Sequence, residues 1–327
     1  LRCEHICLED DGAVQIFDCV EFNRDLRCAD VASDLAFLLM DLTRLGAASA
    51  ADDLQAAYQA AGIDVPDALL RLYWAHRALV RAKVACLKLK DADTAPEAMA
   101  LRVKAADYLD LATAACLNVG PVLIVMTGLS GTGKSTVARR VARALGAPLF
   151  ASDVVRKQLA GVAGAAPAAW RKGIYQPEWT EATYDQLFSL AEAQLAAGRP
   201  AVLDAAFLAA EQRSGAAALA DRLGVPLVII ETICDEAMVA ARLAARSAAG
   251  TSPSDATLAT YRRQRAGLDA SPPPTPAGAL AVQIDTSGDL PIGLDPVFAT
   301  LHDAGIVVAE VLPGLPSQRS CSATDRI

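Results

Sequence analysis

The chain has 327 residues, of which 53% are hydrophobic and 21% charged, and its formal net charge is −8. This length predicts two domains more readily than one, and the apolar content is sufficient for buried cores. The acidic balance argues against duplex nucleic acid as a partner, because surfaces that bind it are strongly basic. No apolar run of about 18 residues occurs, so we expect no membrane-spanning helix and no membrane partner.

The cysteines are spread along the chain. There are eight of them, and none forms a C-x-x-C pair. Scattered cysteines of this kind predict reduced thiols and a cytoplasmic location. The chain begins with Leu1 instead of Met, so we expect it to be part of a longer protein. No pattern in the sequence indicates an oligomeric state.

The first 117 residues are predicted to form a small hairpin followed by a helical bundle. Residues 13–17 alternate apolar and polar side chains after an Asp-Asp-Gly turn, so the second strand of the hairpin would deliver Asp18 to its end. Helical periodicity then marks residues 31–42, 50–61, 66–89 and 96–117. We therefore expect a first domain that spans residues 1–117.

One of these helices has a basic side. Arg77, Arg81 and Lys88 fall on a common face of the helix predicted for residues 66–89. The simpler interpretation is a solvated helix face. The alternative is a surface that meets an acidic partner domain.

The second half shows a different pattern. Asn118-Val119-Gly120-Pro121 is a turn cluster and marks the predicted domain boundary. The strands are predicted at 122–126, 148–151, 201–203, 227–231 and 280–284, and the helices at 134–145, 154–159, 181–197, 209–223, 236–247 and 256–266. Alternating strands and helices predict an α/β fold whose parallel sheet is covered on both faces, a three-layer arrangement. This domain would span 118–307, with a disordered tail at 308–327.

A phosphate-binding loop follows the first of these strands. Residues 128–136 read Gly-Leu-Ser-Gly-Thr-Gly-Lys-Ser-Thr and match G-x-x-x-x-G-K-[ST] between a strand and a helix. The predicted nucleotide-binding residues are Gly128, Ser130, Gly131, Thr132, Gly133, Lys134, Ser135 and Thr136. Glycines let backbone N–H groups point at phosphate oxygens. Lys134 would reach the β- and γ-phosphates and Ser135 would bind Mg²⁺, so ATP and Mg²⁺ are the predicted cofactors.

Two carboxylates follow later strands of the predicted sheet. Asp204 closes the apolar run 201–203, where a carboxylate holds Mg²⁺ in many P-loop proteins, although any strand can end in Asp. Asp153 is a candidate base for an attacking hydroxyl, and Arg156, one turn on, is a candidate clamp for an anion on the acceptor. The alternative for this pair is a helix-capping Asp and a surface Arg.

Arg242 and Arg246 lie four residues apart, ahead of a Gly/Ser/Pro-rich segment. This is a lid-like placement, from which both charges would close over the triphosphate and stabilise the transition state. Ordinary exposed arginines explain the same pattern nearly as well.

Residues 121–285 resemble the P-loop kinases of the polynucleotide-kinase and zeta-toxin-like group, often labelled AAA-family ATPases. The matching pieces are residues 128–136, the block Ser152-Asp153-Val154-Val155-Arg156, residues 173–175, residues 183–184, residues 203–207, and Arg242 with Arg246. The resemblance implies a small hydroxyl-directed kinase in which Asp153 is the base.

Residues 1–117 look like the C-terminal lobe of aminoglycoside-phosphotransferase-like proteins, in particular those fused to such a P-loop domain. The match runs through residues 6–8, 17–18, 21–23 and 30–37. Asp18 would then correspond to a Mg²⁺-binding Asp, as a vestigial site. His5 stands where the resemblance implies a metal-binding Asn, and the His-Gly-Asp expected before Leu1 is absent. We expect this half to be a truncated or scaffold domain.

Two functions follow from these patterns. The first is an ATP-dependent phosphotransferase that acts on a hydroxyl of a small molecule or nucleotide. The second is a nucleotide-dependent switch or ATPase that regulates the helical half or a partner.

Overall fold

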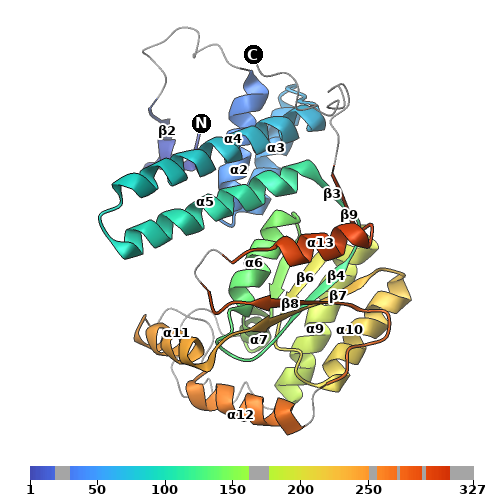
Figure 1. Ribbon diagram of the computed structural model, residues 1–327. Coiled ribbons are helices and arrows are strands. Elements are labelled where there is room, and N and C mark those ends of the chain that lie inside the picture. The colour runs from blue at the N-terminus through green and yellow to red at the C-terminus, as the bar shows by residue number, and fades with distance from the viewer. Residues whose placement is uncertain (19–29, 162–176, 250–255, 271–272, 289–291, 310–327) are drawn as a thin grey trace, which may run out of the picture.

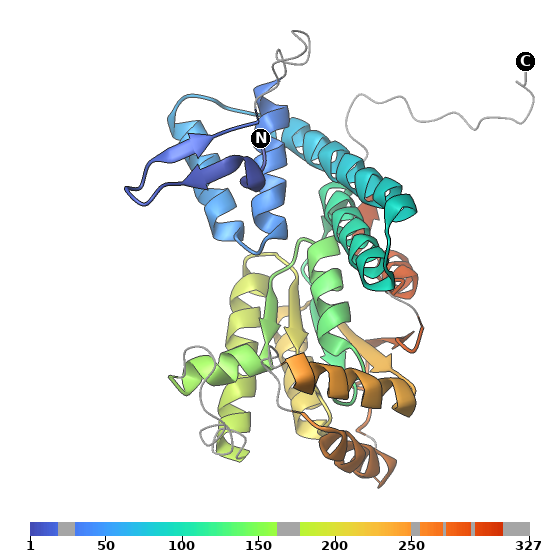
Figure 2. The same cartoon turned by 90° about the vertical axis from the view of Figure 1, so that its left-hand side faces the viewer.

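The structure is a computed structural model and describes residues 1–18, 30–161, 177–249, 256–270, 273–288 and 292–309. The helices are η1 (Cys3–His5), α2 (Val31–Arg44), α3 (Ala48–Ala60), α4 (Asp67–Lys88), η2 (Leu89–Asp91), α5 (Ala95–Cys116), α6 (Lys134–Ala144), α7 (Ser152–Leu159), α9 (Pro177–Ala196), α10 (Ala210–Leu223), α11 (Glu236–Ala249), α12 (Leu258–Ala270) and α13 (Asp295–Asp303). The strands are β1 (Ile6–Leu8), β2 (Val14–Ile16), β3 (Leu117–Val119), β4 (Leu123–Thr127), β5 (Leu149–Ala151), β6 (Ala201–Asp204), β7 (Leu227–Ile233), β8 (Leu280–Asp285) and β9 (Val307–Ala309). Figures 1 and 2 show a helical half stacked on an α/β half.

The helical half forms as its periodicity predicts. Asp30 caps α2, because its side chain accepts a hydrogen bond from the Ala32 N–H group at 2.9 Å. The long helices α4 and α5 pack along each other, and small residues such as Ala78 and Ala82 allow the close approach of Tyr108 and Leu111. The predicted hairpin is present as β1 and β2, which pair antiparallel.

Five parallel strands form the sheet of the α/β half, in the order β5-β6-β4-β7-β8. Every residue of β4 is buried because this strand lies at the centre and both of its faces are covered. Helices α6 and α13 pack on one face of the sheet, and α9 and α10 pack on the other. The predicted three-layer α/β fold is confirmed.

The segment between the two halves differs from the sequence-based expectation. Residues 118–121 were expected to form a turn, but Asn118 and Val119 belong to β3, which pairs antiparallel with β9. The same pairing places Val308 and Ala309 in a strand, although both were assigned to the disordered tail. Residues 310–327 lie outside the described residues. The pairing joins segments far apart in the chain, so local composition does not reveal it.

Salt bridges join the two halves along α5 and α6. The Arg140 guanidinium on α6 donates to both carboxylate oxygens of Asp110 on α5, at 2.7 and 2.8 Å. One turn further on, Arg143 pairs with Asp107. Both Asp110 and the contacting part of Arg140 are largely buried, so this is a packed interface. The helix that follows the P-loop is therefore also the helix that holds the helical half.

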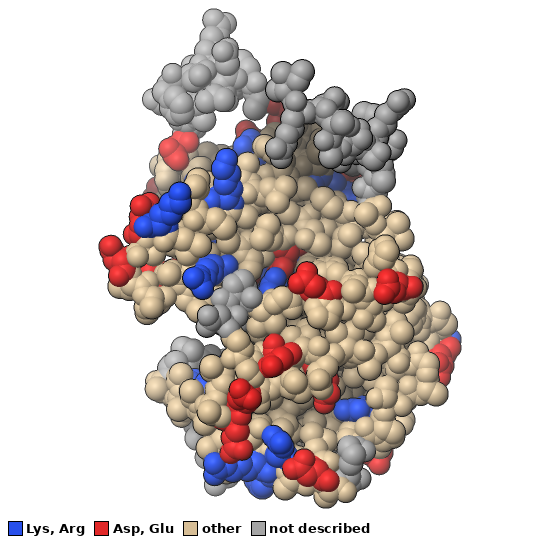
Figure 3. All heavy atoms as spheres, viewed as in Figure 1, with Lys and Arg blue, Asp and Glu red and all other residues tan. Residues whose placement is uncertain are grey.

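Charged side chains of both signs are scattered over the face of the molecule seen in Figure 3, without a continuous basic stretch. Within the described ranges, no helix is long and apolar enough to cross a membrane. The described cysteines that carry free thiols are Cys3, Cys7, Cys86, Cys116 and Cys234.

Candidate functional site

The P-loop connects β4 to α6 and has the backbone shape of a phosphate cradle. Gly131 and Gly133 have φ angles of 86° and 89°, a region that favours glycine. A Cβ atom on Gly131 would also lie 2.9 Å from a Val239 side-chain carbon on α11. Both the left-handed backbone and the close approach of α11 therefore require glycine here.

The polar residues of the loop divide into two groups. Thr132 is buried, and its hydroxyl lies 2.8 Å from that of Thr232 on β7, so it supports the loop from behind. Ser130, Ser135 and Thr136 line the cavity in front of the loop. Of the hydroxyl groups predicted to bind nucleotide, these three can therefore reach a ligand in the cavity.

Lys134 begins α6 and folds back over the loop. Its Nζ atom donates a hydrogen bond to the Leu129 carbonyl at 2.7 Å. Burial lowers the pKa of the Lys134 ammonium to about 8, and Arg246 contributes in the same direction, while Asp204 and Asp153 oppose it. The ammonium group therefore lies within the influence of both predicted carboxylates and of one predicted lid arginine.

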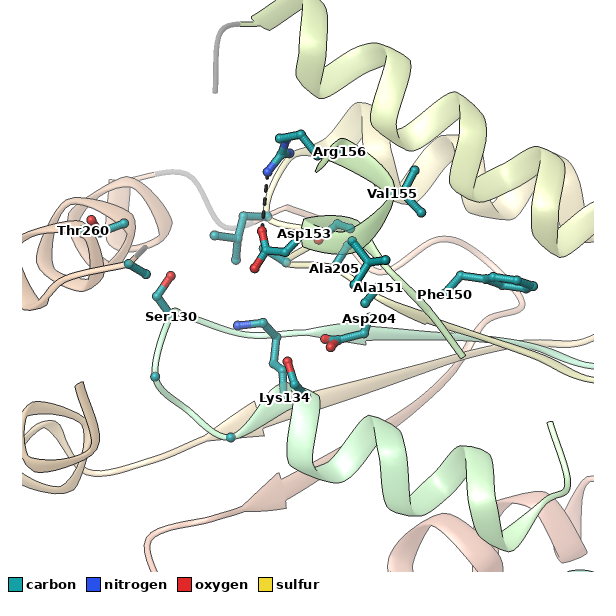
Figure 4. A pocket seen from close by; sticks show the side chains of 18 of the residues that line it. Ser130, Lys134, Phe150, Ala151, Asp153, Val155, Arg156, Asp204, Ala205 and Thr260 are labelled. Atoms are coloured by element: carbon teal, nitrogen blue, oxygen red, sulfur yellow. Dashed lines mark ion pairs between the residues drawn. The ribbon is translucent and has the colours of Figure 1, made fainter. Parts of the chain in front are cut away.

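Asp204 ends β6, beside the P-loop strand, and is 7% exposed. The loop that follows is held tightly. Phe207 has a φ angle of 47°, unusual for a non-glycine residue. Its N–H group donates to the Tyr184 hydroxyl at 3.2 Å, and Thr127 donates to the Ala206 carbonyl at 3.0 Å. These contacts orient Asp204 toward the cavity (Figure 4).

Asp153 and Arg156 lie on the first turns of α7, directly after β5. Their side chains form an ion pair at 3.6 Å, and the exposed fractions are 28% for Asp153 and 10% for Arg156. The N-cap position is Ala151, so Asp153 is not the capping residue of α7. Figure 4 shows the Asp153 carboxylate facing the same space as Lys134 and Asp204. A buried arginine here is not an ordinary surface residue.

The two arginines of α11 have different surroundings. Arg242 donates from Nη1 to the Thr286 hydroxyl at 3.1 Å and from Nη2 to the Thr286 carbonyl at 2.6 Å. Thr286 in turn donates to the Thr132 carbonyl at 2.7 Å, so Arg242 is linked to the back of the P-loop. Arg246 makes a single described hydrogen bond, to the Ala256 carbonyl at 3.1 Å. Arg246 is thus the better placed of the two to move onto a phosphate.

Helix α12 supplies Gln264, a residue that sequence reasoning missed. The Gln264 side-chain oxygen accepts a hydrogen bond from the Ser130 N–H group of the P-loop at 2.9 Å. Arg263 of the same helix and Arg139 of α6 also line the cavity. No local pattern distinguishes Gln264 and Arg139 from other polar residues on exposed helices, and the contact of Gln264 spans 134 positions of the chain.

Most of the predicted site residues line one cavity of about 1850 Å³ (Figure 4). Six basic and two acidic described side chains line it: Lys134, Arg139, Arg156, Arg242, Arg246 and Arg263, with Asp153 and Asp204. An excess of cations around a glycine-rich loop suits a polyphosphate. The structure therefore brings the predicted P-loop residues other than Gly128 and Thr132, both carboxylates, and the predicted arginines Arg156, Arg242 and Arg246 to a single site.

The vestigial site predicted at Asp18 lies elsewhere, beside the hairpin. Asp18 is 71% exposed, and one of its carboxylate oxygens lies 3.3 Å from Nε2 of His5. No group of three metal-ligating side chains occurs among the residues that the structure describes. The role assigned to Asp18 stays a prediction.

The part of the chain that lines this cavity is similar to a known family of protein domains. Residues 123–271 match the AAA domain family. The matching segment runs from β4 to the end of α12 and includes the P-loop, Asp153, Asp204 and both arginines of α11. This segment is therefore similar to the AAA domain family over its P-loop and the strands and helices that follow.

Two curated relatives are the uncharacterized proteins Rv2004c of Mycobacterium tuberculosis and Mb2027c of Mycobacterium bovis. Each is 34% identical over 252 residues, which covers 76% of this chain and 49% of the relative. The chain therefore spans about half the length of these relatives. A match of this length extends beyond residues 123–271 into the helical half.

Solved structures with a similar arrangement include a gluconokinase from Sinorhizobium meliloti and the APS kinase CysC of Mycobacterium tuberculosis. The gluconokinase is 20% identical with a TM-score of 0.37 and covers 57% of this chain and 95% of its own. The APS kinase is 24% identical with a TM-score of 0.27 and covers 35% of this chain and 77% of its own. At this level of similarity, neither carries weight in assigning a substrate.

Proposed function

We propose that the AAA domain is a kinase that transfers the γ-phosphoryl group of ATP to a hydroxyl group of a small molecule or nucleotide. The observation that carries this proposal is the position of Asp153, which faces the same cavity as Lys134 and the P-loop but belongs to a different strand–helix unit. A carboxylate in this position can take the proton of an attacking hydroxyl group.

The residues present fit ATP with Mg²⁺. The P-loop offers backbone N–H groups and the exposed Ser135 hydroxyl, and the Asp204 carboxylate lies at the end of the neighbouring strand. Ser135 and Asp204 would hold the ion, directly or through water, and the ion supplies charge neutralisation to the β- and γ-phosphates. Lys134 and Arg246 would add further positive charge around the phosphates.

In the proposed step, Asp153 accepts the proton of the acceptor hydroxyl as its oxygen forms a bond to the γ-phosphorus. The bond between that phosphorus and the β–γ bridging oxygen breaks, and the electron pair leaves with ADP. Arg156, paired with Asp153 at 3.6 Å, orients the carboxylate and contacts an anionic group of the acceptor.

The size of the cavity supports a second substrate beside the nucleotide. Ligand pockets usually hold about 300–1,000 Å³, whereas this cavity measures about 1850 Å³. The part of the cavity next to Asp153 and Arg156 is lined by α7, a different element from the P-loop. We assign this space to the acceptor.

The direct test is release of γ-phosphate from ATP with Mg²⁺, first alone and then with pools of nucleosides, sugars and aminoglycosides. We expect release to increase with one pool and to depend on Lys134. Release that no pool increases would contradict the kinase and favour the switch described next.

A second candidate function is a nucleotide-dependent switch, and the α5–α6 interface favours it. Nucleotide would bind at the first turn of α6, and Arg140 of the same helix holds Asp110 of the helical half. A shift or rotation of α6 on nucleotide binding would be transmitted directly to α5. We further propose that residues 1–117 are a scaffold derived from an aminoglycoside-phosphotransferase-like lobe.

The switch predicts that Asp110→Asn separates the two halves. Breaking a buried ion pair on one side typically costs about 3–5 kcal/mol, because the other charge stays buried. We expect lower stability and loss of any ATP-induced hydrogen-exchange protection in α5, measured by mass spectrometry, while ATP binding itself is retained. Asp52→Asn on the exposed side of α3 is the matched control. Equal exchange in α5 with and without ATP in the unsubstituted chain would contradict the switch.

Nucleotide affinity is expected to fall as the pH rises above about 8. Lys134 loses its proton near this pH in the free protein, because its pKa is lowered from 10.5 to about 8, and bound phosphates restore the charged form. Binding then takes up a proton, and affinity falls by up to about tenfold per pH unit. The free energy of unfolding depends on pH in the opposite direction. Between about pH 8 and pH 10.5, Lys134 is protonated in the unfolded chain and largely neutral in the folded protein. Its contribution therefore makes the folded protein more stable as the pH rises through this range.

The measurement is the dissociation constant of ATP at a series of pH values on either side of 8. Lys134→Arg keeps its charge throughout and should lack the alkaline decline. An affinity that is constant across the series in the unsubstituted chain would show that Lys134 remains charged.

A further inference from the structure

Four arginine side chains gather around two aromatic rings beside the hairpin of the helical half. Arg2 and Arg77 lie over the Phe37 ring, with guanidinium carbons 5.9 and 5.1 Å from its centroid, and Arg44 and Arg81 lie over the Tyr108 ring at 5.4 and 5.8 Å. All four are half-buried. They come from the N-terminal segment, α2 and α4. We call these four residues the arginine cluster.

Carboxylates balance only part of this charge. Arg2 pairs with Glu4, and Arg44 donates from Nε to Asp41 at 2.9 Å. Arg77 and Arg81, one turn apart on α4, have no ion-pair partner among the described residues.

The hydrogen bonds of Arg77 and Arg81 to described residues are few. Arg77 donates from Nε and Nη2 to the Ser33 hydroxyl, at 3.2 and 2.8 Å. Arg81 makes no hydrogen bond to a described residue, although its Nε atom is buried. Of the five N–H groups on each guanidinium, Arg77 therefore donates two to a described residue and Arg81 donates none.

Such an arrangement is costly in the absence of an anion. Buried charges are normally paired, since an unpaired charge loses its hydration without compensation. Contact with a ring face recovers only about 0.5–2 kcal/mol. Two like charges at positions i and i+4 of a helix also repel each other. Apolar side chains at positions 77 and 81 would pack against Phe37 and Tyr108 without these costs, so packing alone does not account for the two arginines.

We infer that Arg77 and Arg81, flanked by Arg2 and Arg44, form a binding site for the phosphate group of a small anionic compound. The planar guanidinium fork matches the oxygen spacing of phosphate and binds it through two parallel hydrogen bonds. The rings of Phe37 and Tyr108 hold the guanidinium planes in place, so little conformational entropy is lost on binding. The site lies in the helical half and does not depend on the proposed kinase activity.

The test must separate this site from the P-loop, which also binds phosphate groups. We would therefore titrate pyrophosphate, without nucleotide or Mg²⁺, into the chain carrying Lys134→Ala and follow the heat of binding. One site per chain is expected. Arg81→Gln and Arg77→Gln, each added to Lys134→Ala, should weaken binding about tenfold or more, since each removes charge-assisted hydrogen bonds. Lys83→Gln, on the exposed side of α4, is the matched control and should change nothing.

Thermal unfolding of the same proteins supplies an independent readout. Pyrophosphate should raise the unfolding temperature of the Lys134→Ala chain but not that of the chain with Arg81→Gln added. Without pyrophosphate, Arg81→Gln should unfold at the same or a higher temperature, because it removes an unpaired half-buried charge. A purely structural arginine would instead show a lower unfolding temperature that pyrophosphate does not affect.

Two further anions define the ligand class. Inorganic phosphate and a simple phosphate monoester such as phenyl phosphate share the recognised group, and tighter binding of either would identify free phosphate or an ester as the natural form. Acetate at equal ionic strength should not compete. Absence of heat with pyrophosphate, unchanged binding in Arg81→Gln, or competition by acetate would each overturn the proposal.

Discussion

Replacing Asp153 with asparagine is expected to lower acceptor-dependent phosphoryl transfer by about 10²–10⁴-fold, the usual contribution of a general base. The substitution preserves size and removes only the ability to take the proton of the acceptor hydroxyl. ATP binding should change little, because Asp153 lies on α7 and is separate from the loop that holds the phosphates. The measurement is the rate of acceptor phosphorylation at saturating ATP, once the acceptor pool has been identified.

A matched control is available on the neighbouring helix. Asp185→Asn removes an exposed carboxylate from α9 and should leave the rate unchanged. Slow hydrolysis of ATP without an acceptor should also persist in Asp153→Asn, because this substitution leaves the P-loop and Lys134 unchanged. If Asp153→Asn transferred phosphate at close to the normal rate, Asp153 would not be the base, although the P-loop could still be a functional nucleotide site.

Replacing Lys134 with alanine is expected to have an effect of similar size on every nucleotide-dependent reaction. Removing one group that stabilises developing charge typically costs about 10²–10³-fold in turnover. The loss should appear in both acceptor phosphorylation and acceptor-free hydrolysis, which distinguishes Lys134 from Asp153. Release of γ-phosphate measures both reactions.

The same substitution should not destabilise the free protein. The lowered pKa of Lys134 shows that its charge is unfavourable in the folded state, because burial outweighs the attraction of Asp204 and Asp153. We therefore expect an equal or higher unfolding temperature at pH 7, together with loss of the stabilisation that ATP gives to the unsubstituted chain. A marked loss of stability without nucleotide would mean that Lys134 supports the fold through its bond to the Leu129 carbonyl.

The strands and helices of the α/β half follow from local patterns. Each predicted strand occurs within a few residues of its expected position, because buried parallel strands are short, continuous apolar runs bounded by turns. Helix α13 was missed, since it is short, carries few periodic positions and follows a Gly/Pro-rich segment. Strands β3 and β9 were missed because three-residue pairings have almost no periodic signal.

The candidate site was also largely predictable. A P-loop, a carboxylate after the second strand and another after the third must meet at one sheet edge, since all five strands are parallel. The spacing of these residues in the sequence does not show which hydrogen bonds each side chain makes. Thus Arg242 is anchored to Thr286, Arg246 is less constrained, and Gln264 reaches the Ser130 N–H group from α12.

The amino-acid sequence alone therefore determined the fold class, the P-loop and the two carboxylates beside it, because each depends on contacts between neighbours in the chain or on the common direction of parallel strands. Only the tertiary structure decided how α5 docks on α6 through Arg140 and Asp110, and how arginines of α2, α4 and the N-terminal segment come together. The contact of Arg140 with Asp110 spans 30 positions, and that of Arg77 with Ser33 spans 44. They depend on how whole helices pack, and the sequence of a single helix does not show which other helix will contact its charged face.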